Sequence, residues 1–382
     1  MRLDELVRRQ RRRSASEAEP TRSPLVETTG FGSNPGALRM LSFVPDGLPA
    51  GAPLVVALHG CTQSAAGYDR GTGWSDLARH LGFALLLPEQ RKANNPNRCF
   101  NWFEPADTAR DAGEALSIRQ MVARMLAAHR LDPARVFVTG LSAGGAMSSV
   151  MLATYPEVFA AGAIIAGLPY GAAANMPEAF EAMASGRPRP ARDWGNLVRA
   201  ASPHRGPWPR VSVWQGEADT TVRPVNAEQI LRQWQDLHGL AAPPRLEAPS
   251  ASHRRQVWRD ASGQALLEHH SIAGLAHGVP IHSGPGPERG GVAAPHVLDI
   301  GVSSTWHIAG FFGLAGSVRP AVAEPRPAPA LGVIRIGRDG EARMPGAAAS
   351  PGVAPPPPAP ARPSGPGAVI RQALVAAGLM KE

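Results

Sequence analysis

The chain has 382 residues, 43% of them hydrophobic, and carries a formal net charge of +8 at neutral pH. The hydrophobic content is ample for a core, whereas 39 prolines and 41 glycines are too many for one compact fold, so part of the chain is expected to be loop or tail. Many arginines fall within residues 7–13 and most others are scattered, which argues against a nucleic-acid-binding core and favours a solvated basic arm.

Leader sequences, membrane spans and cofactor motifs are not evident in the sequence. No apolar run follows the N-terminal arginines, and no stretch is apolar for long enough to cross a bilayer, so we expect a cytoplasmic protein without a transmembrane segment. Two cysteines are too few for a disulfide scaffold. Metal-binding patterns and glycine-rich phosphate or dinucleotide fingerprints are lacking, so we expect neither a metal nor another cofactor.

The first part of the chain alternates strand-like and helix-like patterns after a charged, weakly ordered arm at residues 1–34. Continuous apolar runs of strand length predict strands that are buried on both faces. The expected strands are residues 36–45, 53–59, 83–88 and 135–139, and the expected helices are residues 74–81 and 111–130.

The same alternation continues to about residue 312. The expected strands are residues 159–167, 210–215, 256–258 and 265–272, and the expected helices are residues 177–185, 225–237 and 296–312. Strands that alternate with helices predict an α/β fold with a mainly parallel central sheet and helices on both faces. In such a sheet the ligand site lies beyond the carboxyl ends of the strands.

The composition changes near residue 316 to alanine, proline and glycine, which cannot build a core. We therefore expect a folded α/β domain at residues 35–315, a disordered linker at residues 316–366 and a short amphipathic helix at residues 367–382. The last helix could dock on a partner or a lipid-like surface, and fraying is the favoured alternative.

The central motif of the chain is Gly140-Leu-Ser142-Ala-Gly144, which joins the strand at residues 135–139 to a helix rich in small residues. A strand, a tight Gly-x-Ser-x-Gly turn and a helix form the setting in which a serine becomes a nucleophile. Small flanking residues let the strand and the helix approach closely. This pattern predicts that the Ser142 hydroxyl is exposed at the apex of a strained turn.

A serine hydroxyl needs a base and an orienting carboxylate to become reactive. In the α/β-hydrolase order the acid follows the serine and the histidine comes last. Glu217 and Asp219 both follow a strand, and Asp219 is preferred because it sits deepest in the turn. His277 is the preferred base because it stands in a Gly-x-x-His-Gly loop, with His282 as its nearest rival.

Hydrolysis also requires donors for the oxyanion of the tetrahedral intermediate. One is expected to be the amide of Ala143, the residue after the nucleophile. The second is expected from the loop after an early strand, where His59-Gly60-Cys61 stands, and we assign it to the Cys61 amide.

Several further motifs accompany these residues between positions 38 and 312. They include Leu58–Gln63, Asn97–Phe103, Gly113–Ala115, Asp132–Met147, Tyr155–Pro156, Gly167–Gly171 and Gly216–Val222. With them the chain resembles the poly(3-hydroxybutyrate) depolymerase family of esterases, which is related to feruloyl and acetylxylan esterases. The resemblance implies an α/β-hydrolase fold with Ser142 as nucleophile, Asp219 as acid and His277 as base. Family members commonly have Trp-Pro-Gly after this histidine, whereas Gly278-Val-Pro-Ile follows here.

The resemblance also implies a polyhydroxyalkanoate-type ester as substrate, cleaved through an acyl-enzyme. The alternatives are a feruloyl or acetyl esterase of plant polysaccharide and, in a different class, an interaction protein tethered to a granule or acidic partner by its termini. Many members of the family are extracellular, which keeps export open beside the cytoplasmic expectation.

Two groups of side chains near the expected site have more than one interpretation. Trp102, Phe103 and Trp74 could line an acyl groove or pack in the core. Cys61 and Cys99 lie in matched motifs, and a disulfide between them would pin the oxyanion loop to the Asn-Trp-Phe loop. Two buried thiols are the equal alternative in a reducing cytoplasm.

Overall fold

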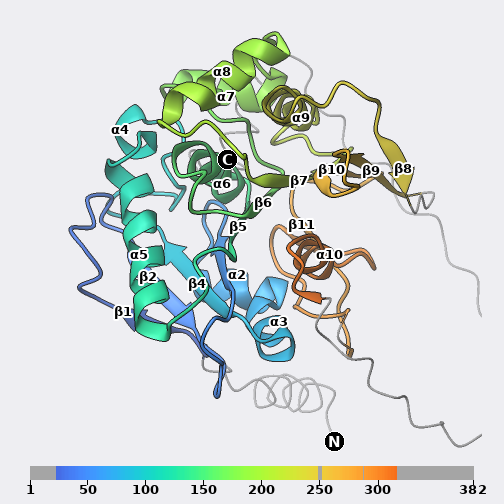
Figure 1. The fold of residues 1–382 in the computed structure, drawn as a ribbon. Coiled ribbons are helices and arrows are strands. Elements are labelled where there is room, and N and C mark those ends of the chain that lie inside the picture. Colours follow the sequence, from blue (N-terminus) through green and yellow to red (C-terminus); the bar gives the residue numbers. More distant parts are fainter. Residues whose placement is uncertain (1–22, 248–251, 287, 316–382) are drawn as a thin grey trace, which may run out of the picture.

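A computed structural model describes residues 23–247, 252–286 and 288–315 (Figure 1). Within them ten strands form one sheet in the order β1-β2-β4-β3-β5-β6-β7-β10-β9-β8, and β11 and β12 form a separate pair. The strands are β1 (Val26–Thr28), β2 (Arg39–Phe43), β3 (Leu54–Leu58), β4 (Ala84–Glu89), β5 (Val136–Leu141), β6 (Ala161–Ile165), β7 (Arg210–Gly216), β8 (Arg245–Glu247), β9 (His253–Arg259), β10 (Ala265–Ile272), β11 (Val279–Ile281) and β12 (Val297–Asp299).

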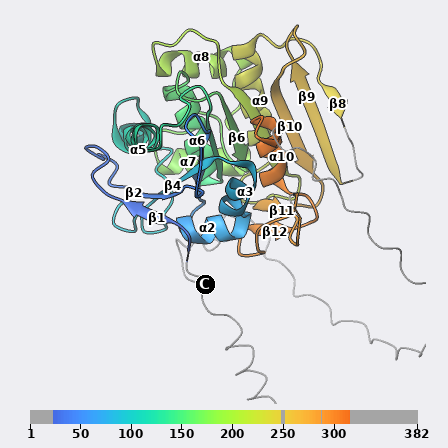
Figure 2. The ribbon, with the colours of Figure 1, turned by 60° about the horizontal axis from the view of Figure 1, so that its bottom comes forward.

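Helices cover both faces of this sheet, and α2 and α3 lie on the side opposite α7 and α8 (Figures 1 and 2). They are α2 (Ala65–Thr72), α3 (Trp74–Leu81), α4 (Pro105–Thr108), α5 (Gly113–His129), α6 (Ala143–Thr154), α7 (Met176–Ser185), α8 (Ala191–Ala201), α9 (Val225–His238) and α10 (Ser304–Phe311). The six central strands run parallel to one another, in the order β4-β3-β5-β6-β7-β10. This is the mainly parallel sheet that the sequence predicts.

The alternation of side chains along each central strand builds two cores. In β3, Leu54, Val56 and Leu58 pack with helices α5 to α9 on one face. Val55 and Ala57 point to the other face, where they pack with α2, α3 and α10. Because every residue of β3 is buried, its sequence needs no polar alternation, which explains the continuous apolar run.

The predicted elements differ from the structure in several places. Residues 296–312 were expected to form one helix, but β12 pairs in parallel with β11 before α10 begins. Ser303 starts this helix by accepting a hydrogen bond from the Trp306 amide. Helices α2 and α8 have no counterpart among the expected elements.

The expected arm and tail are only partly within the described residues. Val26–Thr28, which the prediction included in the arm, pairs antiparallel with β2 as strand β1. Residues 1–22 of the arm, the linker at 316–366 and the terminal helix at 367–382 lie outside the described residues. Among the helices that the structure does describe, none has the length and apolar character needed to cross a membrane.

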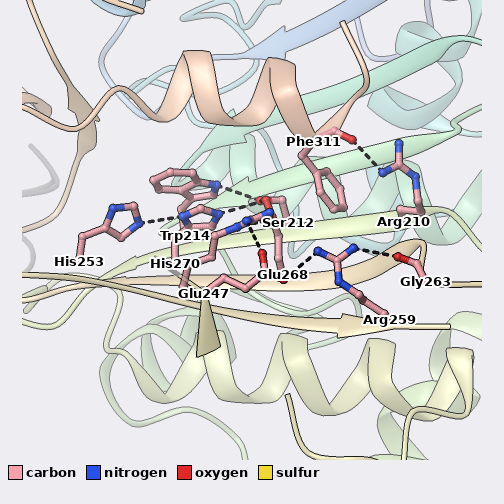
Figure 3. A network of polar contacts seen from close by, with 11 residues as sticks. Arg210, Ser212, Trp214, Glu247, His253, Arg259, Gly263, Glu268, His270 and Phe311 are labelled. Atoms are coloured by element: carbon pink, nitrogen blue, oxygen red, sulfur yellow. Dashed lines mark hydrogen bonds and ion pairs between the residues drawn. The ribbon is translucent and has the colours of Figure 1, made fainter. Parts of the chain in front are cut away.

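A polar network binds β7, β10 and β9 together beneath α10, as Figure 3 shows. Buried Glu268 of β10 accepts hydrogen bonds from Ser212 of β7 at 2.7 Å and from Arg255 of β9 at 2.6 Å. The ring of His270 stacks on Trp214 with centroids 3.7 Å apart. Burial raises the pKa of Glu268, but its contacts with His270 and Arg255 outweigh burial and lower it to about 2. The network therefore fixes the register of β7 and β10, whose following loops carry Asp219 and His277.

Candidate active site

Ser142 lies between β5 and α6 in a strained backbone conformation. Its φ of 57° and ψ of −117° are unusual for a residue with a side chain, and such strain costs roughly 1–3 kcal/mol. The turn is held by two hydrogen bonds, from the Ser142 amide to the Ile165 carbonyl at 2.9 Å and from the Ala146 amide to the Ser142 carbonyl at 2.8 Å. The surrounding chain therefore imposes the turn that the motif predicts.

The two glycines of the motif allow the close approach of strand, turn and helix. A Cβ atom on Gly140 would lie 2.3 Å from the carbonyl oxygen of Gly144. A Cβ atom on Gly144 would lie 2.3 Å from the carbonyl oxygen of Leu58, in the neighbouring strand β3. Both distances are far below van der Waals contact, so any other residue would push the turn away from β3.

His277 joins Ser142 to Asp219. Its Nε2 atom lies 2.9 Å from the Ser142 hydroxyl, and its Nδ1 atom lies 2.8 Å from Oδ2 of Asp219. When Nδ1 carries the proton and donates a hydrogen bond to the carboxylate, the lone pair of Nε2 faces the hydroxyl. The three predicted residues therefore meet in the arrangement of a nucleophile, a base and an orienting acid.

Asp219 is held by donors on both carboxylate oxygens. Oδ1 accepts from the Thr221 and Val222 amides, each at 2.9 Å, and Oδ2 accepts from the Gln215 side chain at 3.2 Å as well as facing His277. The side chain is completely buried. Asp219 is thus fixed in one orientation toward the imidazole.

The two rivals from the sequence lie elsewhere. Glu217 is partly exposed and accepts hydrogen bonds from Ser271 at 2.7 Å and from Arg254 at 2.5 Å. The Ser271 hydrogen bond, together with Arg254, holds the pKa of Glu217 below its usual value. His282 follows β11, and it is His277 that contacts the serine.

The expected oxyanion donors stand at the ends of adjacent strands. Ala143 is the first residue of α6, and Cys61 follows β3, which pairs with β5. Within the part of the chain that the structure describes, neither amide donates to a carbonyl or side-chain acceptor. Both N–H groups therefore lack an acceptor among the described residues.

A disulfide joins the loop after β3 to the loop at residues 94–103. The sulfur atoms of Cys61 and Cys99 are 2.12 Å apart. Beside the bridge, the Thr62 amide donates to the Asn97 carbonyl at 2.6 Å. Of the two interpretations of these cysteines, the structure contains the bridge.

The aromatic residues predicted to line a groove are buried. Trp102 and Phe103 pack edge to face with centroids 5.4 Å apart and are 7% and 5% exposed. The groove interpretation is wrong for Trp74, which is 1% exposed and packs against Phe83 in the core beneath α2 and α3. No face of the Trp74 side chain is left for a substrate.

Two contacts of the site were missed from the sequence. The rings of His277 and His296 meet edge to face with centroids 5.6 Å apart. His296 was expected inside a helix, so nothing pointed to this contact. The second is buried His59, whose Nδ1 lies 2.7 Å from the Gly60 carbonyl while Nε2 accepts from the Gln90 amide at 3.1 Å. Burial lowers the pKa of His59 to about 4, so the ring is neutral near pH 7.

The arrangement is suited to acyl transfer. A hydroxyl, an imidazole and a buried carboxylate are aligned, and the amides of Cys61 and Ala143, which follow the adjacent strands β3 and β5, have no acceptor among the described residues. In the described part of the chain no group of three or more His, Cys, Asp or Glu side chains is arranged to hold a metal ion.

This sheet and serine turn define an α/β-hydrolase. An acetyl xylan esterase structure from Aspergillus awamori matches with a TM-score of 0.61 and 29% identity over 66% of this chain and 93% of the esterase. Residues 40–265 match the family described as Esterase PHB depolymerase, to which the chain therefore belongs.

Two relatives support this assignment. A poly(3-hydroxyalkanoate) depolymerase C from Paucimonas lemoignei is 46% identical over 76% of this chain and 70% of its own length. A feruloyl esterase B from Neurospora crassa is 36% identical over 68% of this chain and 89% of its own. The protein is thus a carboxylic-ester hydrolase of the depolymerase-like serine esterase type, as the motifs predict.

Proposed function

We propose that the protein hydrolyses polyhydroxyalkanoate-type esters, as polymer or oligomer, with Ser142 as nucleophile, His277 as base and Asp219 as orienting acid. The observation that carries this proposal is the pair of contacts at His277, 2.9 Å to Ser142 and 2.8 Å to Asp219. The 46% identity to a poly(3-hydroxyalkanoate) depolymerase supports the substrate class.

The proposed reaction has two steps. His277 Nε2 takes the hydroxyl proton while Ser142 Oγ attacks the ester carbonyl, and the imidazolium then gives the proton to the departing alcohol oxygen. An acyl-enzyme on Ser142 results. In the second step His277 removes a proton from water, the hydroxide attacks the acyl carbonyl, and the hydroxy acid leaves as Ser142 regains its proton.

The amides of Cys61 and Ala143 stabilise the oxyanion of both tetrahedral intermediates. Two observations support this assignment: the two residues stand at the ends of adjacent strands, and their amides have no acceptor among the described residues. Each such donor typically contributes ~3 kcal/mol to the transition state. Trp102 and Phe103, which are 7% and 5% exposed, are proposed to contact the acyl chain, because their loop is bridged to the oxyanion loop through Cys99.

The second candidate is a feruloyl or acetyl esterase of plant polysaccharide, which the 36% identity to a feruloyl esterase favours. A substrate panel separates the two. We expect the kcat/KM of the purified protein for 3-hydroxybutyrate oligomers to exceed those for feruloyl esters and acetylated xylan, and Ser142→Ala to abolish all three. A higher kcat/KM for either plant ester would contradict the proposed substrate class.

Two further proposals concern the cellular compartment of the protein and its attachment to a polymer granule. The cross-link between Cys61 and Cys99 is of a kind that persists in oxidising compartments, which favours export over the cytoplasmic expectation. Attachment to a polymer granule rests on the arginines at residues 7–13 and on the composition of the C-terminal segment. Deleting residues 1–22 or 316–382 should reduce sedimentation with polymer granules and leave hydrolysis of a soluble ester unchanged. Equal sedimentation of both deletions and the full chain would dismiss the tether.

A further inference from the structure

The loop that carries the Cys61 amide rests on a buried polar chain that the reaction itself does not use. The chain runs from His59 through Gln90 to Glu114, and each of these side chains is at most 1% exposed. They come from three elements, namely the ends of the parallel strands β3 and β4 and the first turn of α5. Buried polar groups at a junction of this kind need a complete set of partners.

Gln90 is the centre of this chain, and its carboxamide has no spare hydrogen-bonding capacity. Nε2 donates to the Cys99 carbonyl at 3.0 Å and to Oε1 of Glu114. Oε1 accepts from the Arg91 amide at 2.9 Å and from the Asn94 side chain at 2.8 Å. Two donors and two acceptor positions are therefore all used, which leaves one orientation for the side chain.

The backbone of Gln90 reaches the oxyanion loop directly. Its amide donates to Nε2 of His59 at 3.1 Å, so Nδ1 of His59 carries the proton and donates to the Gly60 carbonyl at 2.7 Å. That carbonyl belongs to the peptide group whose N–H is the Cys61 amide. A shift of Gln90 would thus move the peptide plane that is proposed to hold the oxyanion.

Glu114 holds the neighbouring loop at residues 94–103, which the disulfide joins to the oxyanion loop. Oε1 of Glu114 accepts from the Gln90 side chain, and Oε2 accepts from the Asn101 amide at 2.9 Å. Asn101 lies in the segment that begins with Cys99, the disulfide partner of Cys61. The oxyanion loop is consequently held twice, through His59 on one side and through the Cys99 bridge on the other, and both paths meet at Gln90.

We infer that Gln90 and Glu114 are positioning residues for the oxyanion hole, acting through His59 and Cys99 on the Cys61 peptide. The inference rests on the proposed function, in which that peptide binds the oxyanion. Because such a donor acts in the transition state, displacing it lowers kcat and leaves KM nearly unchanged. A displacement of about 1 Å costs about 100-fold in rate, and a smaller one correspondingly less.

The test compares Gln90→Met, which keeps the side-chain length and removes all four hydrogen bonds, with Gln229→Met. Gln229 is also a buried glutamine, 2% exposed, and bonds the Arg187 amide at 3.3 Å, far along the chain from the oxyanion loop. With a soluble p-nitrophenyl ester we expect Gln90→Met to lose about 10- to 100-fold in kcat per folded molecule, with KM within about threefold. Gln229→Met should lower the melting temperature and keep kcat within about twofold.

Variants of Glu114 test the same inference independently, also if Gln90→Met does not fold. Glu114→Ala removes both acceptors and should lower kcat at least about tenfold, whereas Glu114→Gln keeps a carbonyl acceptor and should retain at least about a third of it. Unchanged kcat in folded Gln90→Met or Glu114→Ala overturns the inference. An active wild-type protein in which Ser142→Ala has no effect would instead refute the proposed function, so the two failures are distinguishable.

Discussion

Asp219 and His277 are 58 residues apart in the chain, yet Oδ2 of the first lies 2.8 Å from Nδ1 of the second. The parallel pairing of β7 with β10 brings them together, because each residue stands in the loop that follows one of these neighbouring strands. The polar network at Glu268 locks that pairing from beneath. The distance between acid and base is thus set by strand register.

Replacing the acid tests this relationship. Asp219→Asn keeps the shape of the side chain but removes the charge that stabilises the imidazolium and the acceptor that fixes the Nδ1 proton. We expect kcat to fall by roughly 10³- to 10⁴-fold. Glu217→Gln is the matched control two residues away, because Glu217 is engaged with Arg254 and Ser271, and its kcat should change less than about threefold. Comparable losses in the two variants would contradict the assignment of Asp219.

The serine turn should not accept a methyl group. In Gly144→Ala the new Cβ would meet the Leu58 carbonyl oxygen at 2.3 Å, so we expect a loss of about 2–3 kcal/mol in unfolding free energy and at least ~100-fold in kcat. Gly310→Ala in α10 has nothing within 4 Å of its Cβ and should raise stability by ~0.5–1 kcal/mol. Urea unfolding and ester hydrolysis measure both. A stable, active Gly144→Ala enzyme would show that the turn is not as close to β3 as described.

The Cys61–Cys99 disulfide closes a loop between residues 38 positions apart and crosses directly to the oxyanion loop. Reducing it, or replacing both cysteines by serine, should lower the unfolding free energy by about 2–4 kcal/mol and also lower kcat. Melting curves with and without reductant measure the first effect. The double serine variant is the control, because reductant should not change its melting temperature. Identical melting of the wild type in both conditions would mean that no bridge forms.

Glu114 makes stability depend on pH. Burial, with the nearby charge of Asp107, raises the pKa of its carboxyl from 4.5 to about 8. The folded protein therefore keeps a proton that the unfolded chain releases near pH 4.5. The resulting stability is complete below that pH and is lost as the pH rises to about 8. The upper bound is on the order of 5 kcal/mol at 1.36 kcal/mol per pKa unit.

Glu114→Gln cannot titrate, so its unfolding free energy should fall less than that of the wild type between pH 5 and pH 8. Glu104→Gln is a suitable comparison, since Glu104 is a partly buried acid near the same loop. Denaturant unfolding at several pH values measures the slope. Parallel curves for the wild type and Glu114→Gln would contradict the raised pKa.

The parts of the site that could be predicted from sequence are those encoded within a few consecutive residues. Ser142 and its glycines form one local turn, and the acid and base each stand in a loop that follows a strand expected from the sequence. The choice between groove and core stayed open for Trp74 because the sequence does not tell which apolar side chain a second core will cover. His296 was placed in a helix because the residues that pair as β12 are apolar at spacings that also suit a helix.

The hydrogen-bonded chain of His59, Gln90 and Glu114 could not be predicted from the sequence. Gln90 sits at the end of a strand in an otherwise polar segment, and nothing in its neighbours distinguishes it from a solvated glutamine. Its role comes from hydrogen bonds to residues 9 to 31 positions away. Such contacts depend on how three elements pack, so local patterns do not reveal them.

Covalent labelling tests most directly whether Ser142 is the nucleophile. The folded protein is treated with a fluorophosphonate, digested and examined by mass spectrometry. We predict one phosphonate per molecule on the peptide that contains Ser142, loss of labelling in Ser142→Ala, and strong slowing in Asp219→Asn. Absence of label on the active wild-type enzyme, or label on a different serine, would contradict the account.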